Sequence, residues 1–384
     1  MAVQLNATAH PGRERESDLL RVTDLRVSFS TPDGVLQAVR GISFAVRRGQ
    51  TLGIVGESGA GKSVSTQAIL RLVAGARVSG RAVFDGQDLL TASEVELRAV
   101  RGARIGVIFQ DPLSNLHPFY RVGWQIAEAI RTHTHTGRRA AHRRAVELLD
   151  LVGIPQPDRR VNDFPHQFSG GMRQRAMIAM ALSCNPALLV ADEPTTALDV
   201  TVQAQIIELI RRLQAEFHTA VIMITHDLGL LADLADDIVV MYAGRAVEVA
   251  PRRTLYYTPH HPYTRGLLDS LPARASRRGR LRPIPGQPPS LLSLPAGCPF
   301  HPRCAHAMDR CRTDPPELES LTGADHQSAC WLPTDWVADG SASAGPAGPG
   351  SAGAAGSPGP ADPTGTAGSA GSAWVARSAT GGAP

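Results

Sequence analysis

The stretch VGESGAGKSV, residues 55–64, decides how the rest of the chain is interpreted. Gly56, Gly59 and Gly61 break an apolar run, and a lysine, a serine and a helix-like pattern follow them. Lys62 is the only lysine among 384 residues, although lysine and arginine together number 39. This position therefore requires a property that arginine lacks.

The spacing Gly56-x-x-x-x-Gly61-Lys62-Ser63, between a predicted strand and a predicted helix over 62–74, matches the P-loop pattern. Glycines let backbone N–H groups turn toward phosphate oxygens, and the helix start adds the positive end of its dipole. An ammonium reaches between the β- and γ-phosphates, where a wide planar guanidinium does not fit. Ser63 can hold Mg²⁺. The predicted nucleotide-binding residues of this stretch are Gly56, Glu57, Ser58, Gly59, Ala60, Gly61, Lys62, Ser63 and Val64.

The second landmark is LLVADE, residues 188–193. An apolar strand that ends in Asp192 places a carboxylate where it can bind the metal ion. Glu193 comes next and can polarise an attacking water as a base. A strand followed by Asp-Glu is weak evidence alone, but beside a P-loop it indicates nucleotide hydrolysis.

Short strands alternate with helical segments along the chain, which predicts a parallel sheet covered on both faces. Residues 121–185 are predicted to be mostly helical, and residues 237–250 form a late hairpin. The fold class is therefore α/β: a P-loop NTPase with a RecA-like parallel core, an antiparallel β subdomain, a helical subdomain and a small Cys-rich C-terminal extension.

Composition excludes several classes of protein. There is no run of 18 apolar residues and no apolar N-terminal stretch of the signal-peptide type, so we expect a cytoplasmic chain whose cysteines are reduced or metal-bound rather than disulfide-bonded. The formal net charge of +4 comes from scattered arginines rather than a dense basic stripe, so no nucleic-acid partner is expected.

The segment FSGGMRQR, residues 168–175, resembles the signature loop of ABC-transporter ATPases. It reads F-S-G-G-M where the family has L-S-G-G-Q, and Thr196 stands where the family has Ser before the D-loop. Four further residues resemble other family motifs in the expected order. They are Phe29 for the aromatic that stacks on adenine, Gln110 for the Q-loop, Asp199 for the D-loop and His226 for the switch histidine.

The resemblance implies that two cassettes face head to tail. Each ATP lies between the P-loop of one chain and the signature residues of the other. It implies Glu193, His226 and Gln110 as catalytic residues, and Ser63, Gln110 and Asp192 as Mg²⁺ ligands. The signature residues acting in trans are Ser169, Gly170, Gly171 and Met172.

Rival nucleotide-binding classes fit less well. A GTPase needs an N-K-x-D motif, which is impossible when the one lysine is already used. A soluble nucleic-acid ATPase of this superfamily would carry two cassettes or a long coiled coil. A soluble regulatory or nucleic-acid ABC ATPase that uses the same dimer stays open as the alternative from another class.

Three stretches beyond the cassette resemble the C-terminal extension of oligopeptide and dipeptide importer ATPases: TPHHPYTRGLLDSLP at 258–272, IPGQPPSLL at 284–292 and GCPFHPRC at 297–304. Nickel importers share much of this extension. The resemblance implies an ATP-hydrolysing peripheral subunit, on the cytoplasmic face of the bacterial inner membrane, that powers import of di- or oligopeptides, with nickel as the runner-up substrate. The implied partners are a second, distinct ATPase chain, two integral-membrane permeases and an extracellular or periplasmic binding protein.

Cys298, Cys304, Cys311 and Cys330 are concentrated in 33 residues with the spacing C-x5-C-x6-C-x18-C. Four thiols so close together in a cytoplasmic chain indicate a metal. The spacing lacks the tight C-x2-C pairs of structural zinc. The resemblance implies a [4Fe–4S] cluster with a structural role, and zinc or unligated thiols are the alternatives. Cys184 is interpreted as a buried thiol.

The predicted domain organisation has four parts. Residues 1–20 are a flexible N-terminus, and 21–254 form the cassette with its helical subdomain at about 111–185. Residues 255–335 form the extension. Residues 336–384, rich in Gly, Ala, Ser and Pro, cannot bury enough apolar surface to fold and form a disordered tail.

Overall fold

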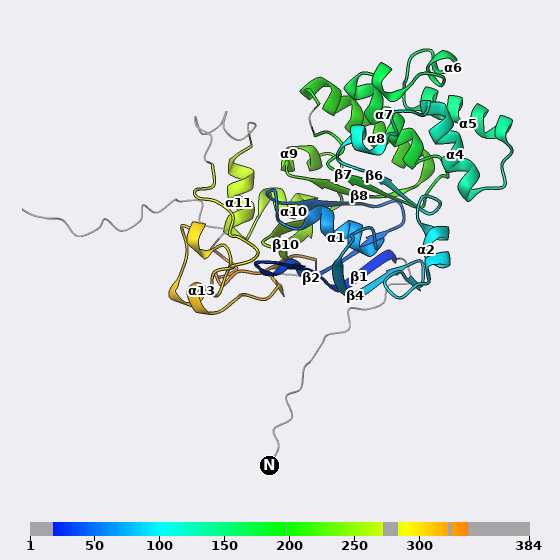
Figure 1. The fold of residues 1–384 in the computed structure, drawn as a ribbon. Helices are drawn as coiled ribbons and strands as arrows, with labels where there is room; N and C mark the ends of the chain where they lie inside the picture. The colour runs from blue at the N-terminus through cyan, green and yellow to red at the C-terminus, as the bar shows by residue number, and fades with distance from the viewer. Residues whose placement is uncertain (1–17, 197, 272–282, 322–324, 337–384) are drawn as a thin grey trace, which may run out of the picture. The chain divides into compact units, whose positions relative to one another are not determined.

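The computed structural model describes residues 18–196, 198–271, 283–321 and 325–336 (Figure 1). Most of the predicted N-terminus and tail lies outside these residues. Strand β1 nevertheless begins at Asp18, and Leu19 and Leu20 are buried in the core. At the other end, the indole N–H of Trp336 donates to the carbonyl of His260 at 3.0 Å. Both boundary segments therefore carry packed residues at their inner ends.

An eight-stranded mixed sheet forms the centre, in the order β11-β12-β10-β9-β3-β8-β7-β6. Strands β9, β3, β8, β7 and β6 run parallel, and β10, β12 and β11 add an antiparallel edge. The bounds are β3 Thr51–Val55, β6 Ile105–Ile108, β7 Leu188–Asp192, β8 Ala220–Thr225, β9 Asp237–Tyr242, β10 Arg245–Pro251, β11 Glu319–Ser320 and β12 Gln327–Ser328. The parallel strands have their carboxyl ends at the same side of the sheet, so the loops after β3, β6, β7 and β8 meet there.

A second, antiparallel sheet has the order β2-β1-β4-β5. Its strands are β1 Asp18–Thr31, β2 Gly34–Arg47, β4 Ala76–Phe84 and β5 Gln87–Asp88. Together with helices α1 and α2 it covers one face of the large sheet, through a core to which β3 contributes Leu52 and Ile54. Val55, the next residue along β3, points to the opposite core, as the period of two in a strand requires.

The helices on that opposite face include the predicted helical segment, seen in green at the top of Figure 1. The helix bounds are α1 Lys62–Ile69, α2 Glu94–Val100, α3 Pro112–Asn115, α4 Val122–His133, α5 Arg138–Leu151, α6 Pro157–Arg160, η1 Pro165–Gln167, α7 Gly170–Ala181, α8 Val200–Phe217, α9 Leu228–Leu231, α10 Arg252–Tyr257, α11 Pro262–Asp269, η2 His301–Arg303 and α13 Asp309–Thr313. None of the helices in the described ranges combines the length and apolar character needed to cross a bilayer.

Helix α1 ends at Ile69, five residues before the predicted end. Arg71 takes a left-handed conformation with φ 51°. The N–H of Leu72 donates to the carbonyl of Gln67 at 3.0 Å, and that of Arg71 to Ala68 at 2.9 Å. This is a Schellman cap, which glycine usually signals, and the chain has arginine at the left-handed position instead. The stop signal was therefore absent from the sequence pattern.

The C-terminal extension joins the large sheet, which the sequence did not predict. Its strand β12 pairs antiparallel with β10, and Glu248 is opposite Ser328 in the register. Glu248 is fully buried and accepts the backbone N–H groups of His260 and His261 and the ring N–H of His326. A buried carboxylate requires such donors, so these contacts fasten the extension to the sheet edge.

Candidate nucleotide-binding and catalytic site

The P-loop connects the fully buried strand β3 to α1, as the sequence predicts. A Cβ atom on Gly56 would lie 2.2 Å from the carbonyl oxygen of Met241, so no larger residue fits. Gly61 has φ 94°, and a Cβ there would lie 2.3 Å from the carbonyl oxygen of Ala38. Ser58 and Gly59 are exposed at the tip of the loop, whereas Ala60 is buried and Val64 packs partly against the core.

Lys62 is 5% exposed, and its ammonium lies inside the loop. Its Nζ donates to the carbonyl oxygens of Gly56 at 2.9 Å and Glu57 at 3.1 Å, and lies 3.7 Å from Glu193 Oε1. Burial lowers the pKa of Lys62, and the nearby carboxylates oppose that shift. The site thus holds one desolvated cation aimed at the space that the loop encloses.

Ser63 and Asp192 are brought together from α1 and the end of β7. The Ser63 hydroxyl donates to Asp192 Oδ1 at 2.7 Å, and the side-chain amide of Gln67 donates to Oδ2 at 3.3 Å. Asp192 is 2% exposed, and burial raises its pKa. A buried carboxylate beside a hydroxyl is a donor set that suits Mg²⁺.

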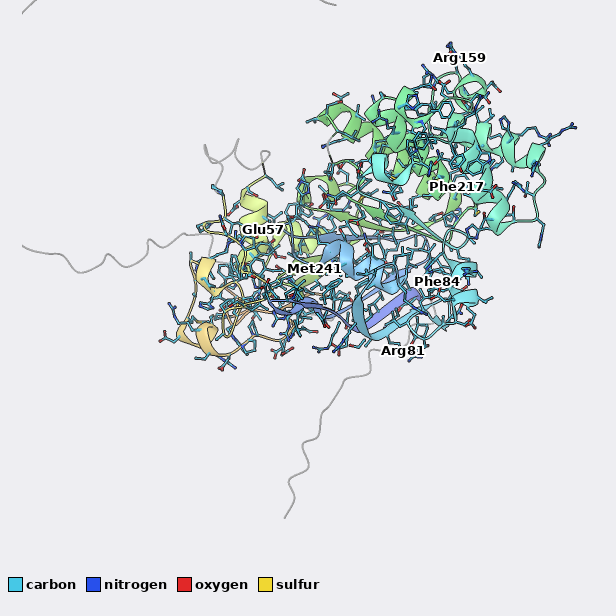
Figure 2. All side chains as sticks on the ribbon, in the orientation of Figure 1. Glu57, Arg81, Phe84, Arg159, Phe217 and Met241 are labelled. Carbon is cyan, nitrogen blue, oxygen red and sulfur yellow. The ribbon has the colours of Figure 1, made fainter. Side chains whose placement is uncertain are left out.

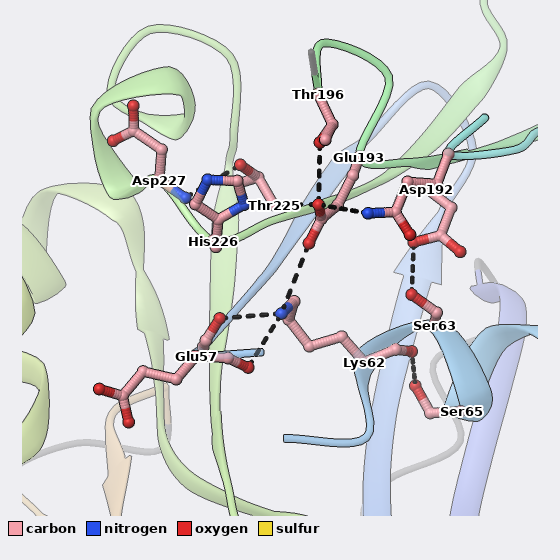
Figure 3. A network of polar contacts seen from close by, with 12 residues as sticks. Glu57, Lys62, Ser63, Ser65, Asp192, Glu193, Thr196, Thr225, His226 and Asp227 are labelled. Carbon is pink, nitrogen blue, oxygen red and sulfur yellow. Dashed lines mark hydrogen bonds and ion pairs between the residues drawn. The ribbon is translucent and has the colours of Figure 1, made fainter. Parts of the chain in front are cut away.

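The Glu193 carboxylate is the meeting point of four elements, as the dashed lines in Figure 3 show. Its Oε2 accepts from the Gln110 amide at 3.0 Å and from the Thr196 hydroxyl at 2.8 Å, and the His226 Nδ1 lies 3.4 Å away. Glu193 itself has φ 45°, a conformation that is strained for a residue other than glycine. The structure therefore brings Gln110, Glu193 and His226 together with Lys62.

Phe29 lies in β1, opposite Leu36 of β2, and packs against the core that also contains Ala60. Its ring is half-buried. No hydrogen bond or ion pair is available to a phenylalanine side chain, so its predicted stacking on adenine depends on position alone.

The predicted signature and D-loop residues lie side by side, at the starts of α7 and α8. Ser169 caps α7 by accepting from the N–H of Met172 at 3.3 Å, and Asp199 caps α8 by accepting from Val202 at 3.0 Å. The α-carbon of Gly171 faces Val202 so closely that a Cβ would lie 3.0 Å from its Cγ1. Among the described residues, no polar contact joins these helix starts to the P-loop of the same chain.

Three residues that contact the site, Tyr263, Arg303 and Gln67, were not predicted from the sequence. Glu57 donates its backbone N–H to the Tyr263 hydroxyl at 2.8 Å, and its carboxylate accepts two hydrogen bonds from Arg303. Gln67, noted above, was the third. Tyr263 and Arg303 lie in the motifs HPYTRG and HPRC of the extension, but nothing in those motifs indicates how near they come to the P-loop.

The four predicted cysteine ligands line one small apolar cavity, together with Phe300 and Trp331. Burial, with a smaller contribution from the other thiols, raises the pKa of Cys330 to about 12 and that of Cys304 to about 11. In the described ranges, no three or more His, Cys, Asp or Glu side chains are grouped closely enough to hold a single metal ion. Cys184, the fifth cysteine, is half-buried, and burial raises its pKa.

Two family models match this sequence. The model described as ABC transporter matches residues 39–196. The model described as the oligopeptide/dipeptide transporter C-terminal region matches residues 247–311. The first range covers the P-loop and runs to Thr196, and the second covers Tyr263 and three of the four clustered cysteines.

Curated relatives share about half of their residues with this chain. The oligopeptide transport ATP-binding protein OppD of Salmonella typhimurium is 49% identical over 334 residues, which cover 87% of this chain and 99% of that protein. OppD of Bacillus subtilis is 53% identical over 77% of this chain and 83% of its own length. The dipeptide transport ATP-binding protein DppD of Escherichia coli is 48% identical, over 83% and 97% respectively.

A solved structure with the same fold is the dimeric ATP-binding cassette MJ0796 in a post-hydrolysis state bound to ADP and Pi. It has a TM-score of 0.56 and 25% identity, and the match covers 61% of this chain and 99% of that one. A second dimeric structure of the same cassette, described as a bacterial ABC transporter cassette, has a TM-score of 0.56 and 26% identity. The shared region is a complete cassette.

Proposed function

This chain belongs to the family of ATP-binding proteins of oligopeptide and dipeptide ABC transporters, and we propose that its P-loop and the strand ends beside it form one half of each ATP site in a dimer of cassettes. The chain is an ATPase subunit that powers peptide import. Its solved neighbours include a cassette dimer that holds ADP and Pi after hydrolysis.

The network around Glu193 is the observation that carries the residue assignments. In the proposed site, Lys62 and the P-loop N–H groups bind the phosphates, and Phe29 stacks on the adenine. Ser63, Asp192 and Gln110 would hold Mg²⁺, which would supply positive charge to the phosphates. Glu193 orients the attacking water and takes its proton, and His226 contacts the γ-phosphate.

The separation of the two halves of the site supports a dimer. Ser169 and the P-loop lie on different elements, and the part of the chain that the structure describes shows no polar contact between them, so the exposed start of α7 can receive a phosphate from another chain. Helix N-termini bind anions through their free N–H groups and dipole. We assign Ser169, Gly170, Gly171 and Met172 to the partner's ATP, with Asp199 beside the interface. The partner cassette is a distinct chain.

A patch of exposed aromatic residues supports docking on a membrane permease. Phe119 is 81% exposed, Tyr120 46% and Trp124 48%, and the rings of Tyr120 and Trp124 stack at 4.3 Å. The patch follows Gln110 closely in the sequence. Phe119 and Tyr120 lie just before α4, and Trp124 lies in its first turn. Exposed aromatic clusters mark protein interfaces, and this one follows Gln110 in the sequence. The subunit therefore sits at the cytoplasmic face of the inner membrane, with two permeases and a binding protein.

We also propose a [4Fe–4S] cluster on Cys298, Cys304, Cys311 and Cys330. The cluster places each thiolate on its own iron, so the four sulfurs need a shared cavity rather than one shared ion. Zinc, the alternative, requires four ligands around a single position. The common cavity supports the cluster, whose role is to hold the extension together.

The substitution Glu193→Gln tests the assignment of the base. Turnover should fall by about 10²-fold or more because the amide cannot accept the proton of water. ATP should still bind, so the variant should form a stable dimer with its partner cassette in the presence of ATP, measured by light scattering. Wild-type turnover in this variant would refute the assignment, and failure to dimerise with ATP would refute the proposed composite site.

Metal analysis tests the cysteine assignment. Anaerobically purified protein should be brown and contain about four iron atoms per chain. Replacement of Cys311 by serine should abolish the colour, whereas Cys184→Ser should retain it as the matched control. Colourless protein with stoichiometric zinc would contradict the cluster.

A further inference from the structure

Every hydrogen-bonding group of Glu57, the residue that follows the first P-loop glycine, is engaged. Its N–H donates to Tyr263 at 2.8 Å, and its carbonyl accepts from Lys62 at 3.1 Å. Its carboxylate accepts from Arg303 at 2.6 and 2.9 Å. In Figure 2 Glu57 lies beside α11, the helix that carries Tyr263. One residue thus connects the phosphate-binding lysine to two side chains of the C-terminal extension.

Arg303 is itself held firmly. Its side chain is 5% exposed, and its Nε donates to the carbonyl of Pro285 at 2.9 Å. Its Nη1 also donates to the Tyr242 hydroxyl at 3.2 Å, and the guanidinium lies over the rings of Tyr242 and Phe300. A planar fork with this many fixed partners presents two parallel N–H groups to a carboxylate with little freedom to move.

The negative charge of Glu57 makes its contact with Arg303 important for the phosphate site. A carboxylate in the loop that must receive a triphosphate would repel the ligand if it were unpaired. Its field already reaches Lys62, where Glu57 is one of the anions that oppose the lowering of the lysine pKa. Arg303 offsets that charge through two hydrogen bonds, and solvent screens the contact little on the Arg303 side, where the side chain is 5% exposed.

The extension also faces the loop beyond this ion pair. A hollow of about 300 Å³ is lined on one side by Glu57, Ser58, Gly59 and Ala60, and on the other by Pro288, Pro289 and Leu291. The extension therefore forms a wall next to the P-loop, and Arg303 is its charged contact.

We propose that Arg303 is a positioning residue for ATP: it neutralises Glu57 and fixes the first half of the P-loop from outside the cassette. This inference rests on the proposed nucleotide site and adds to it a residue of the extension. Arg303 directly precedes Cys304. The residue that contacts the P-loop is therefore bonded directly to a residue that lines the cysteine cavity.

Titration of the full-length chain with Mg²⁺ and a fluorescent ATP analogue tests the proposal. The Arg303→Gln variant should bind the analogue about tenfold more weakly, because it leaves the half-buried carboxylate of Glu57 unpaired in the loop that binds the phosphates. Arg312→Gln is the matched control: Arg312 is an exposed arginine of the same extension that also adjoins a clustered cysteine, and its affinity should equal that of the wild type. Thermal unfolding of each variant checks the fold.

The double variant Arg303→Gln/Glu57→Gln separates charge from general damage. Removing both charges should restore the affinity to within about threefold of the wild type, because the repulsion disappears with the carboxylate. A purely structural role for Arg303 would leave the double variant as weak as the single one, or weaker, and that result would overturn the proposal.

Two further outcomes are decisive. Wild-type affinity in Arg303→Gln would overturn the inference while leaving the nucleotide site intact, whereas failure of the wild-type chain to bind the analogue would overturn the site itself. If Arg303→Gln does not fold, Arg303→Lys replaces it. Lysine keeps the charge but not the two-pronged contact, so binding about threefold weaker than wild type supports the proposal, and equal binding contradicts it.

Discussion

At the scale of single residues, the site is built from side chains whose surroundings allow few substitutes. Lys62 lies among the carbonyl oxygens of its own loop and the carboxylate of Glu193, with 5% of its surface exposed. A point charge with three donors satisfies this arrangement, and a flat guanidinium is too wide for it. This accounts for the single lysine in a chain whose lysine and arginine residues number 39, all but one of them arginine.

Substitution of Lys62 by arginine should therefore fail despite the conserved charge. We expect nucleotide binding to weaken at least about tenfold, or about 1.4 kcal/mol, because the larger group displaces the loop or the phosphates. Equilibrium titration with ATP measures the effect. Arg71→Lys, at the end of the same helix, is the converse control and should leave the affinity unchanged. Undiminished binding by Lys62→Arg would remove the geometric explanation for the lone lysine.

At the scale of elements, parallel strands gather the chemistry and a buried polar group attaches the extension. Glu193 follows β7 and His226 follows β8, and the two strands run parallel, so their carboxyl ends meet. On the far edge of the same sheet, Glu248 of β10 receives N–H groups from the segment that begins α11. That helix carries Tyr263 to the P-loop, so attachment at β10 supports the nucleotide site from a distance.

This attachment should make folding stability sensitive to acid. Burial lowers the pKa of His260 below 6.5, a shift that Glu248 opposes and His326 reinforces. The unfolded chain therefore binds a proton at a higher pH than the folded chain does, and stability is lost as the pH falls below about 6.5.

Denaturant unfolding at several values between about pH 8 and pH 5 measures this loss. The slope of unfolding free energy against pH should be smaller in His260→Asn than in the wild type. The exposed His142 provides the control, since His142→Asn should keep the wild-type slope. An unchanged slope in His260→Asn would show that His260 does not contribute to the acid sensitivity.

At the scale of the whole molecule, two surfaces of the described chain have features that suit contact with partner proteins. Within the described residues, no polar contact joins the starts of α7 and α8 to the P-loop, and we propose that one chain contains halves of two different ATP sites. The aromatic patch of Phe119, Tyr120 and Trp124 leaves apolar area exposed. The proposed assembly, in which closure of two cassettes on ATP moves a permease, would account for both features.

Substitution in the aromatic patch should separate assembly from nucleotide binding. The double variant Phe119→Ser/Trp124→Ser should lose most of its co-purification with co-expressed permeases, because it removes the apolar area buried in the contact. Its ATP affinity should stay that of the wild type. Val95→Ser is the control: it removes an apolar side chain on α2 that is 78% exposed, and it should not affect assembly. Intact assembly in the double variant would exclude the patch as the docking surface.

The sequence by itself determined the parts of this protein that depend on local chemistry. The P-loop and the strand that ends in Asp192 and Glu193 follow from residue types at fixed spacing, since tight turns and strand ends are local. The roles of Gln110, Ser169, Asp199 and His226 come from the ordered resemblance to ABC-transporter ATPases. The alternation of strands and helices was enough to predict the layered α/β fold.

Only the tertiary structure decided how segments distant in sequence meet. The early end of α1 has no glycine signal, because Arg71 takes the left-handed position. The pairing of Glu248 in β10 with Ser328 in β12 joins residues 80 positions apart, and the contact of Arg303 with Glu57 joins residues 246 positions apart. Burial and charge in the folded chain decide such contacts, so they cannot be predicted from patterns among neighbouring residues in the sequence.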